Sequence, residues 1–300
     1  YTTLFRSLSL TSDATRFANF ILHPVETGRF LLDGGAMFGV VPKTLWSRHL
    51  QPDESNRIPM AMRSLLIKSE TTGRIYLVDN GSGDKFSEKM QSILGLDYQH
   101  SSLPDSLDRV GVQADEITDL IFTHLHFDHC GGTTSYNASN ELTENFPNAT
   151  YHVHEMHWET ALHPNAREKA SFYKENIDPI LLSGRLNLTY DSYQFEENLT
   201  IRVVNGHTSG QQLPVLTSGD KTLIFIADLI PTFAHIPLPW IMGYDMQPLV
   251  TLEEKETLLS EAVENQYYLF MQHDADHEVV TVKNVDGKYQ ADQFLLLNDI

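Results

Sequence analysis

The residues best suited to chemistry in this chain lie together in Thr123–Gly132, which reads THLHFDHCGG. This segment holds His124, His126, Asp128 and His129, four residues of types that bind metal ions. Four ligand-type residues at this spacing do not share one face of a helix or a strand, so they predict a tight loop around a positive charge. Imidazole nitrogens with a carboxylate and no thiolate suit zinc or a similar divalent ion.

The elements that must position these residues are mostly strands. Short apolar runs bounded by turn residues predict strands at 29–32, 64–68, 74–78, 119–122, 150–154, 199–204, 212–216, 222–226, 268–272, 278–282 and 289–294. Helical patterns predict helices at 85–94, 155–174 and 252–266. Thr251 and Glu254 are predicted to form a capping box at the start of the last helix. Asp286 and Gly287 predict a hairpin turn between the last two strands.

Further motifs follow the predicted strands. Besides the H-x-H-x-D-H string they are Val78-Asp79-Asn80-Gly81, Gly206-His207-Thr208-Ser209-Gly210, Ala227-Asp228 and His273-Asp274. In this order and spacing they resemble the early aspartate turn, the third-histidine loop, the bridging aspartate and the last histidine of the metallo-β-lactamase superfamily. The resemblance runs from about Ser64 to His273 and therefore covers most of the chain.

This resemblance implies an α/β fold, the four-layer αββα sandwich, in a single domain over residues 1–300 with residues 1–60 as an N-terminal extension. It also implies seven ligands for two divalent ions: His124, His126 and His207 for one, Asp128, His129 and His273 for the other, and Asp228 as the bridge. Seven ligands are too many for one tetrahedral ion and suit two ions that share a carboxylate and a hydroxide. We expect zinc, with cobalt, manganese or iron as alternatives.

The segment 32–42 and the residues after Asp228 resemble one branch of the superfamily, which contains quorum-quenching lactonases and methyl-parathion-hydrolase-like phosphotriesterases. This implies that a hydroxide bridging the ions hydrolyses lactones or other esters, N-acyl-homoserine lactones included, with phosphotriester hydrolysis as a main or side reaction. We expect Asp128 also to pass a proton to the leaving alkoxide. Phe233, His235 and Trp240 are expected to line the substrate pocket. The alternatives are a β-lactamase, a thioester hydrolase or a mononuclear-iron redox member of the same fold.

Two positions depart from the family's pattern. Gln211 stands where relatives often have a second histidine, and Ser209 replaces a proline. That histidine is generally not a ligand, so the departure leaves the two-ion site intact. Lactonases of the family often place a tyrosine soon after the bridging aspartate, whereas Ile230 and Pro231 stand there in this chain and Tyr244 is a distant substitute.

The remaining histidines and the one cysteine have structural interpretations. Cys130 adjoins the histidine string, and we expect it to be a packed neighbour rather than a ligand or nucleophile. His152 and His154 alternate on one predicted strand, so they share a face, and we expect structural or outer roles for them. Surface or capping roles are expected for six others: His23, His49, His100, His157, His163 and His277.

Composition excludes several classes of protein. The net charge of −19 disfavours nucleic acid as a partner, and one cysteine excludes a disulfide framework. No apolar run approaches the roughly 18–20 residues of a membrane span, so we expect a soluble protein acting on a small neutral ester, lactone or phosphotriester. A homodimer is left open. Because the chain begins at Tyr1 without an export signal, we expect processing, and both the cytoplasm and export remain open.

Overall fold

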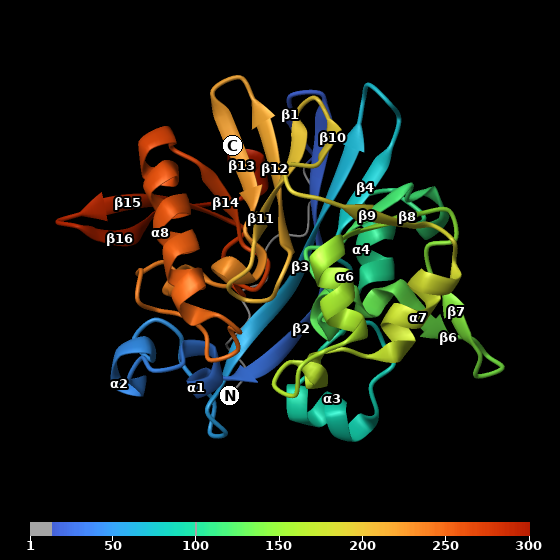
Figure 1. The fold of residues 1–300 in the computed structure, drawn as a ribbon, viewed down its shortest axis with the longest axis horizontal. Helices are drawn as coiled ribbons and strands as arrows, with labels where there is room; N and C mark the ends of the chain where they lie inside the picture. The colour runs from blue at the N-terminus through green and yellow to red at the C-terminus, as the bar shows by residue number, and fades with distance from the viewer. Residues whose placement is uncertain (1–13, 100) are drawn as a thin grey trace.

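The computed structural model describes residues 14–99 and 101–300, so the prediction for His100 falls outside the described residues. Two seven-stranded sheets face each other in the middle of the molecule (Figure 1). In spatial order, the first sheet contains β1 (Thr15–Phe17), β2 (Phe20–Asp33), β3 (Arg57–Ser69), β4 (Ile75–Val78), β5 (Asp119–Ile121), β8 (Thr150–His154) and β9 (Leu186–Thr189). The second contains β10 (Gln194–Glu196), β11 (Leu199–Val204), β12 (Gln211–Ser218), β13 (Lys221–Phe225), β14 (Tyr268–Phe270), β15 (Val279–Val285) and β16 (Lys288–Leu295). A separate hairpin pairs β6 (Thr134–Tyr136) with β7 (Leu142–Glu144).

Helices cover the outer faces and the ends of the sheets. They are α1 (Gly34–Phe38), α2 (Lys43–Trp46), α3 (Glu88–Leu94), α4 (Leu103–Arg109), α5 (Phe127–Cys130), α6 (Glu155–Leu162), α7 (Lys174–Leu182) and α8 (Pro248–Asn265). Short 3₁₀ turns span Ala114–Glu116, Gly131–Thr133, Lys169–Ser171, Ala227–Leu229, Phe233–His235 and Leu297–Asp299. Among the described residues, no helix has both the length and the apolar character needed to cross a membrane.

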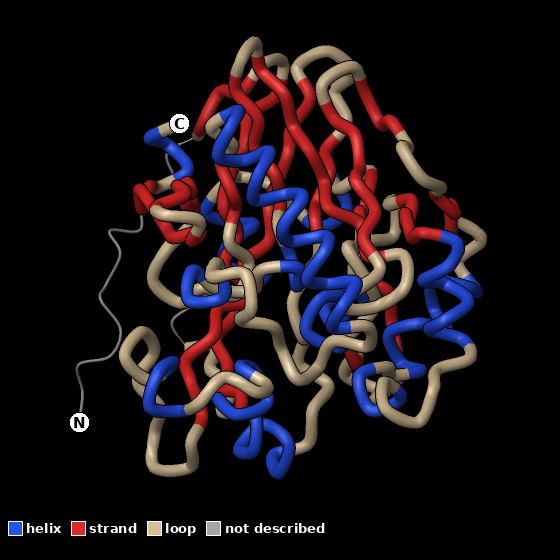
Figure 2. Tube along the Cα trace, turned by 60° about the vertical axis from the view of Figure 1, so that its left-hand side comes forward, coloured by secondary structure: helices blue, strands red, loops and turns tan. Residues whose placement is uncertain are grey.

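The period-two alternation of strand β3 explains the layering. Leu65 and Ile67 point into the core between the two sheets, whereas Leu66 belongs to a second core under α4, α6 and α7. On the opposite side of the molecule, α8 buries Leu258 and Leu259 against the second sheet (Figures 1 and 2). The order of layers is therefore helix, sheet, sheet, helix, which confirms the predicted αββα sandwich.

All eleven predicted strands are present, and the largest difference in their bounds lies near the N-terminus. The structure extends the strand expected at 29–32 to the fourteen-residue β2, which pairs along β3. Residues 14–60 thus contribute β1, β2, α1 and α2 to the fold. The predicted turn at Asp286 and Gly287 joins β15 to β16, and both residues have positive φ, 51° and 78°, as a tight hairpin requires.

All three helix predictions need correction. The helix expected over 155–174 ends at Leu162, because Pro164 cannot continue it and disfavours helical geometry at His163. The last helix begins at Pro248, one turn before the predicted start, so Thr251 and Glu254 lie inside it and form no capping box. The helix expected at 85–94 begins at Glu88, and Ser87 accepts a hydrogen bond at its start.

Candidate metal centre

Five strands deliver the ligand-type residues to one end of the two sheets. Asp79 directly follows β4, the H-x-H-x-D-H segment follows β5, and the loop with His207 follows β11. Asp228 comes after β13, and His273 after β14. The predicted tight loop is present up to His126, after which the one-turn helix α5 carries Asp128 and His129.

The seven predicted ligands lie together in two groups. In what we call the His124 group (His124, His126 and His207), Nδ1 of His126 lies 3.2 Å from Nε2 of His207. In the Asp128 group (Asp128, His129 and His273), the two Nε2 atoms of the histidines are 3.2 Å apart. Asp128 Oδ2 lies 3.7 Å from Nε2 of His129 and 3.8 Å from Nε2 of His273. Within each group the ligand atoms all lie within 4.8 Å of one another, close enough to surround one ion.

Asp228 lies between the two groups, with one oxygen toward each. Its Oδ2 is 3.1 Å from Nε2 of His207 and 3.9 Å from Nε2 of His124. Its Oδ1 is 2.9 Å from Nε2 of His273 and 3.6 Å from Nε2 of His129. This is the arrangement that a carboxylate shared by two ions requires. Ala227, directly before it, has a positive φ of 43°, a conformation that costs a non-glycine residue energy.

Unpaired buried atoms at the centre also fit bound ions. The seven side chains are all buried, and Nε2 of His124 and Oδ1 of Asp228 lack a hydrogen-bond partner of acceptable geometry. A buried polar atom without a partner is costly, and a metal ion would satisfy both atoms. The donor set of five imidazoles and two carboxylates suits divalent ions such as zinc. The residues present therefore fit two divalent ions.

Burial and the neighbouring charges shift the pKa values of the centre in opposite directions. Burial and the neighbouring His129 hold the pKa of His124 well below its usual value. Burial alone would also lower the pKa of His129, but the carboxylates of Asp128 and Asp228 raise it well above that value. Burial raises the pKa of Asp228, but His273, His129 and His207 more than offset this and hold it well below its usual range. Because metal ligands bind ions in their deprotonated form, ions and protons compete for these side chains.

Four of the five imidazoles contact an outer acceptor through the nitrogen opposite the ligand nitrogen. The contacts are His126 Nε2 with Glu168 Oε1 at 3.2 Å, His207 Nδ1 with Asp245 Oδ1 at 2.9 Å, His129 Nδ1 with Asp79 Oδ2 at 2.8 Å and His273 Nδ1 with the Ala61 carbonyl at 2.8 Å. Such contacts fix the tautomer and the orientation of a ligand ring. No motif in the sequence indicated Glu168, and Asp245 belongs to the residues after Asp228 that carry the branch resemblance but were given no role.

Asp79 connects the two groups through hydrogen bonds, because it contacts His129 directly and His124 by way of Thr123. Its carboxylate accepts hydrogen bonds from the backbone and hydroxyl of Thr123 at 2.8 and 2.7 Å and from the amide of Gln272 at 2.8 Å, besides its contact with His129. The Thr123 hydroxyl also lies 3.0 Å from Nδ1 of His124. Asp79 has a positive φ of 54°, so the turn after β4 holds it in a strained conformation that serves the centre.

His157 and Glu254 connect further segments of the centre. His157, expected at the surface, is fully buried, and its Nε2 accepts a hydrogen bond of 2.7 Å from the backbone of Leu125. Burial lowers its pKa to about 3, so the ring stays neutral and its Nδ1 donates to the Ser209 carbonyl. Glu254 accepts hydrogen bonds from the backbone of Asn205 and Gly206. A histidine three residues after the strand 150–154 and a glutamate in a helix were the sequence signals available for these roles.

The other singled-out residues are structural. Cys130 is buried and its thiol donates to the Leu125 carbonyl, as expected of a packed neighbour. His152 contacts Asp119 at 2.7 Å on the first sheet. His23, expected at the surface or as a cap, is buried. Gln211 is also buried, and neither polar atom of its side chain has a hydrogen-bond partner among the described residues.

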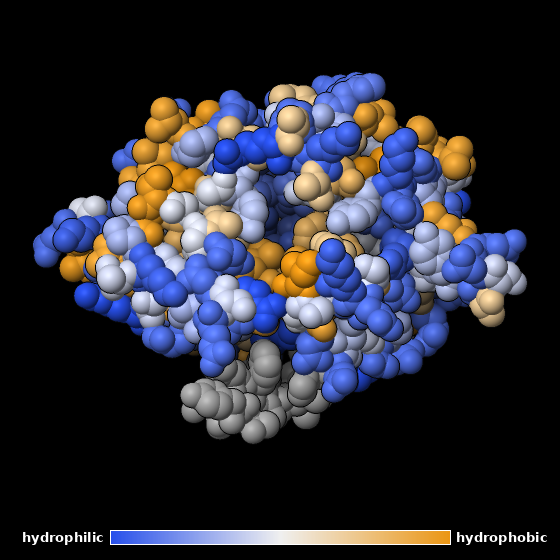
Figure 3. All heavy atoms as spheres, turned by 90° about the horizontal axis from the view of Figure 1, so that it is seen from below, coloured by the Kyte–Doolittle hydropathy of each residue, from blue (hydrophilic) through white to orange (hydrophobic). Residues whose placement is uncertain are grey.

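The centre opens into a cavity of about 370 Å³ on the face where α1 and α3 lie. Figure 3 looks onto this face and shows a hollow near its middle with apolar side chains at its edge. Five of the seven ligand-type residues line the cavity: His126, Asp128, His207, Asp228 and His273. Its remaining wall is mostly apolar and includes four methionines: Met37, Met60, Met242 and Met246.

The three residues expected to line the substrate pocket lie elsewhere. Phe233, His235 and Trp240 are not among the described residues that line this cavity. His235 is fully buried, stacks on Phe38 and contacts the Met37 carbonyl at 2.9 Å. Phe233 and Trp240 pack beside it against the same core. The loop after Asp228 therefore supports the residues of the wall, whereas Tyr244, thought too distant in sequence, lines the cavity itself.

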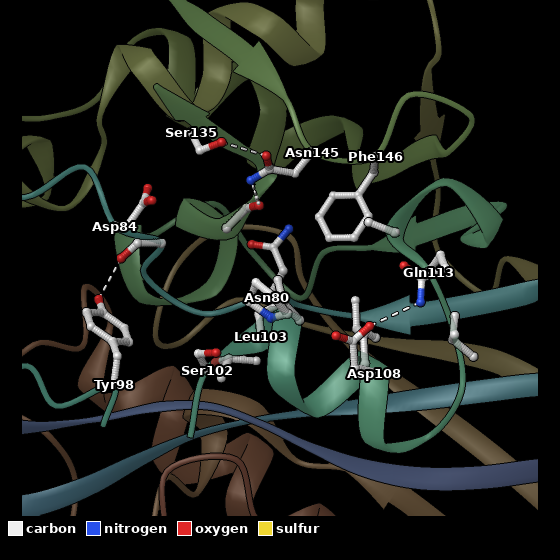
Figure 4. A pocket seen from close by; sticks show the side chains of 17 residues that line it. Asn80, Asp84, Tyr98, Ser102, Leu103, Asp108, Gln113, Ser135, Asn145 and Phe146 are labelled. Carbon is white, nitrogen blue, oxygen red and sulfur yellow. Dashed lines mark hydrogen bonds between the residues drawn. The ribbon is translucent and has the colours of Figure 1, made fainter. Parts of the chain in front are cut away.

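A larger cavity of about 520 Å³ lies on the other side of the ligand-bearing segment (Figure 4). Asn80 and Gly132 form part of its wall, as do Leu103 and Phe146. None of the seven ligand-type residues lines it. The smaller cavity is therefore the one of these two that the ligand-type residues line.

The comparisons with known proteins agree with this geometry. Residues 63–273 match the model of the metallo-beta-lactamase superfamily. The N-acyl homoserine lactonase AiiA of Bacillus thuringiensis subsp. kurstaki is 26% identical over 175 residues, which is 57% of this chain and 62% of the relative's length. The match thus spans less than two thirds of that curated relative.

Solved structures share the whole architecture. A probable metal-dependent hydrolase from Staphylococcus aureus superposes with a TM-score of 0.83 at 27% identity, covering 94% of this chain and 100% of that one. AidC, a dizinc quorum-quenching lactonase in complex with its product, superposes with a TM-score of 0.75 at 19% identity, covering 95% and 98%. At that identity the second likeness shows the fold alone. The chain belongs to the metallo-β-lactamase superfamily.

Proposed function

We propose that this protein is a metal-dependent hydrolase that opens small neutral lactones or esters, N-acyl-homoserine lactones included. The observation that carries the proposal is the pair of ligand groups bridged by Asp228 and open to a mostly apolar cavity. The family, and the relatives and structural neighbours described as lactonases, support the same reaction class.

The proposed ion ligands are those of the two groups, with Asp228 between them, and zinc fits this donor set best. Two divalent ions in such a site lower the pKa of a water molecule and polarise a carbonyl or phosphoryl oxygen. Asp128, a member of the second group, also lines the cavity. We propose that its carboxylate carries a proton to the leaving oxygen.

The cavity wall favours a neutral, partly apolar substrate. Arg167 is the one Lys or Arg in the described lining, and its guanidinium already donates to the carbonyl of Gly243. No free cation is therefore left among the described lining residues to hold an anionic substrate. Methionine side chains are flexible and adapt to ligands of different shape, which suits an acyl chain.

Tyr244 is the proposed hydroxyl donor to the substrate. It lines the cavity and is 40% exposed, so a substrate can reach it. Burial, with a contribution from the negative charges of Asp33 and Asp128, raises the pKa of Tyr244 to about 12. The hydroxyl therefore keeps its proton at neutral pH and can donate a hydrogen bond to a carbonyl or leaving oxygen.

A substrate panel on protein of known metal content tests the proposal. It contains N-hexanoyl-L-homoserine lactone, a p-nitrophenyl ester, a paraoxon-type triester and a cephalosporin. We expect lactone opening to dominate, with slower turnover of the ester and the triester. A cephalosporin hydrolysed in preference to every lactone and ester, or no hydrolysis by protein that carries two ions, would contradict it.

A further inference from the structure

Glu168 is a buried carboxylate in the loop between α6 and α7. Only 2% of its surface is exposed, although it lies outside any helix or strand. Asn165 holds it from both ends, accepting a hydrogen bond from the Glu168 backbone at 3.0 Å and donating its amide to Oε2 at 3.2 Å. The loop exists because Pro164 ends the preceding helix.

The other carboxylate oxygen faces the metal centre. Oε1 of Glu168 lies 3.2 Å from Nε2 of His126, and the Thr208 hydroxyl donates to the same oxygen. Thr208 directly follows His207, whose Nε2 lies 3.2 Å from Nδ1 of His126. Glu168 thus contacts both of the segments that form the His124 group.

The neighbours of Glu168 explain why a carboxylate stands here. The amide of Asn165 and the hydroxyl of Thr208 both donate to it, and His126 can donate only if its proton is on Nε2. A carboxylate accepts on both oxygens, whereas a glutamine would turn a donor toward one of these groups. The contact therefore favours the tautomer of His126 that leaves Nδ1 free for an ion.

We propose that Glu168 is a positioning residue of the metal centre, which fixes the ring of His126 and, through Thr208, the loop that carries His207. Acceptors of this kind raise the basicity of the ligand and are typically worth about 10–100-fold in metal affinity. The proposal rests on the two-ion site of the proposed function. Because Glu168 also lines the cavity, it links the cavity wall to one half of the centre.

The test is a stepwise titration of metal-free protein with Co²⁺, followed by absorption spectroscopy and by metal analysis. In Glu168→Gln we expect one of the two dissociation constants to weaken by about 10–100-fold and the spectrum of that step to change, while the other constant stays the same. Thr208→Val, which keeps the carboxylate, should weaken the same constant by less. Glu159→Gln is the matched control, since it makes the same substitution at an exposed position of α6.

Two unchanged constants in Glu168→Gln would overturn the proposal. If that variant does not fold, ¹⁵N spectra of the histidines in the metal-loaded wild-type protein decide the question. A proton on Nε2 of His126 supports the role of Glu168, and a proton on Nδ1 contradicts it. Wild-type protein that takes up fewer than two Co²⁺ ions would instead refute the two-ion site itself, so the two failures are distinguishable.

Discussion

The two halves of the metal centre orient their histidines by different means. In the His124 group, the outer partners Glu168 and Asp245 come from loops, and residues of those loops also line the cavity. In the Asp128 group, the outer partners are Asp79 at the end of β4 and the backbone carbonyl of Ala61 in β3. The outer partners of the Asp128 group therefore belong to the first sheet, whereas those of the His124 group belong to loops that also line the cavity.

The distribution of charge differs in the same way. Apart from the shared Asp228, the His124 group contains only imidazoles, and its carboxylates Glu168 and Asp245 lie one contact further out. The Asp128 group has one carboxylate among its own members and one, Asp79, further out. Each group thus has two carboxylates besides Asp228. Both lie outside the ligands in the His124 group, whereas one of the two is itself a ligand-type residue in the Asp128 group. We infer that loop changes affect the first ion position more than the second.

Removing the shared carboxylate should have the largest effect, since it acts on both halves at once. In Asp228→Ala the two groups lose the residue between them, and the buried imidazoles of both groups lose a carboxylate that contacts them. We expect fewer than two ions per chain and a loss of lactone hydrolysis well beyond the roughly 100-fold that an outer partner is worth. Metal analysis and kcat/KM measure this. Two retained ions with normal activity would contradict the role of Asp228 as the carboxylate shared by the two groups.

Asp128 should matter for chemistry as well as for ion binding. Asp128→Asn, in protein that retains both ions, should slow aliphatic lactones far more than p-nitrophenyl substrates, because an alkoxide needs a proton as it leaves. The expected gap is on the order of 10²–10⁴-fold. Steady-state rates on both substrate types check this. Equal losses at unchanged metal content would mean that Asp128 serves only as a ligand.

The outer carboxylates sharpen the comparison. Asp245 contacts only His207 among the ligands, so Asp245→Asn should weaken one dissociation constant by about 10–100-fold. Asp79 contacts His129 directly and reaches His124 through Thr123, so Asp79→Asn should weaken both constants. Stepwise metal titration distinguishes the two patterns. The same single-step effect in both variants would show that the halves are not held differently.

The smallest expected effects concern the cavity wall. Met246 lines the cavity, so Met246→Ala should change the preference among acyl-chain lengths by about tenfold, the lower end of what one apolar contact is worth. Trp240 lies outside the described lining, so Trp240→Ala should instead lower stability by roughly 0.5–3 kcal/mol and leave the preference unchanged. Relative rates across a lactone series, with thermal unfolding, measure both. If the preference among acyl-chain lengths changed only in Trp240→Ala, the loop with Trp240 would line the substrate pocket, as the sequence predicted.

Sequence reasoning succeeded where the ligands follow strands. Each ligand motif comes directly after an apolar strand, and strand ends at one edge of a sheet lie close together, so the αββα layers were predictable, as was the gathering of these motifs. It failed where contacts between residues far apart in the sequence decide which side chains reach the centre. Glu168 and Asp245 lie in segments without a periodic pattern, and their contacts span 42 and 38 residues. His157 looked like a surface histidine, because nothing local shows that the Leu125 backbone donates to it.

The cavity wall was hard to predict for a related reason. Proximity in sequence to Asp228 favoured Phe233, His235 and Trp240, but the 3₁₀ turn at Phe233–His235 directs this loop into the core. The wall is formed instead by Met37 of α1 and by residues after the loop, such as Met242. Which side of a loop faces a cavity depends on packing against distant elements, and the sequence alone does not encode it locally.

The most direct test of the two-half centre combines metal loading with activity. Metal-free wild-type protein is titrated with Zn²⁺ while bound metal and the opening of N-hexanoyl-L-homoserine lactone are measured on the same samples. We predict two ions per chain in two resolvable steps, with full activity only when the second step is complete. Full lactonase activity at one ion per chain would contradict the account.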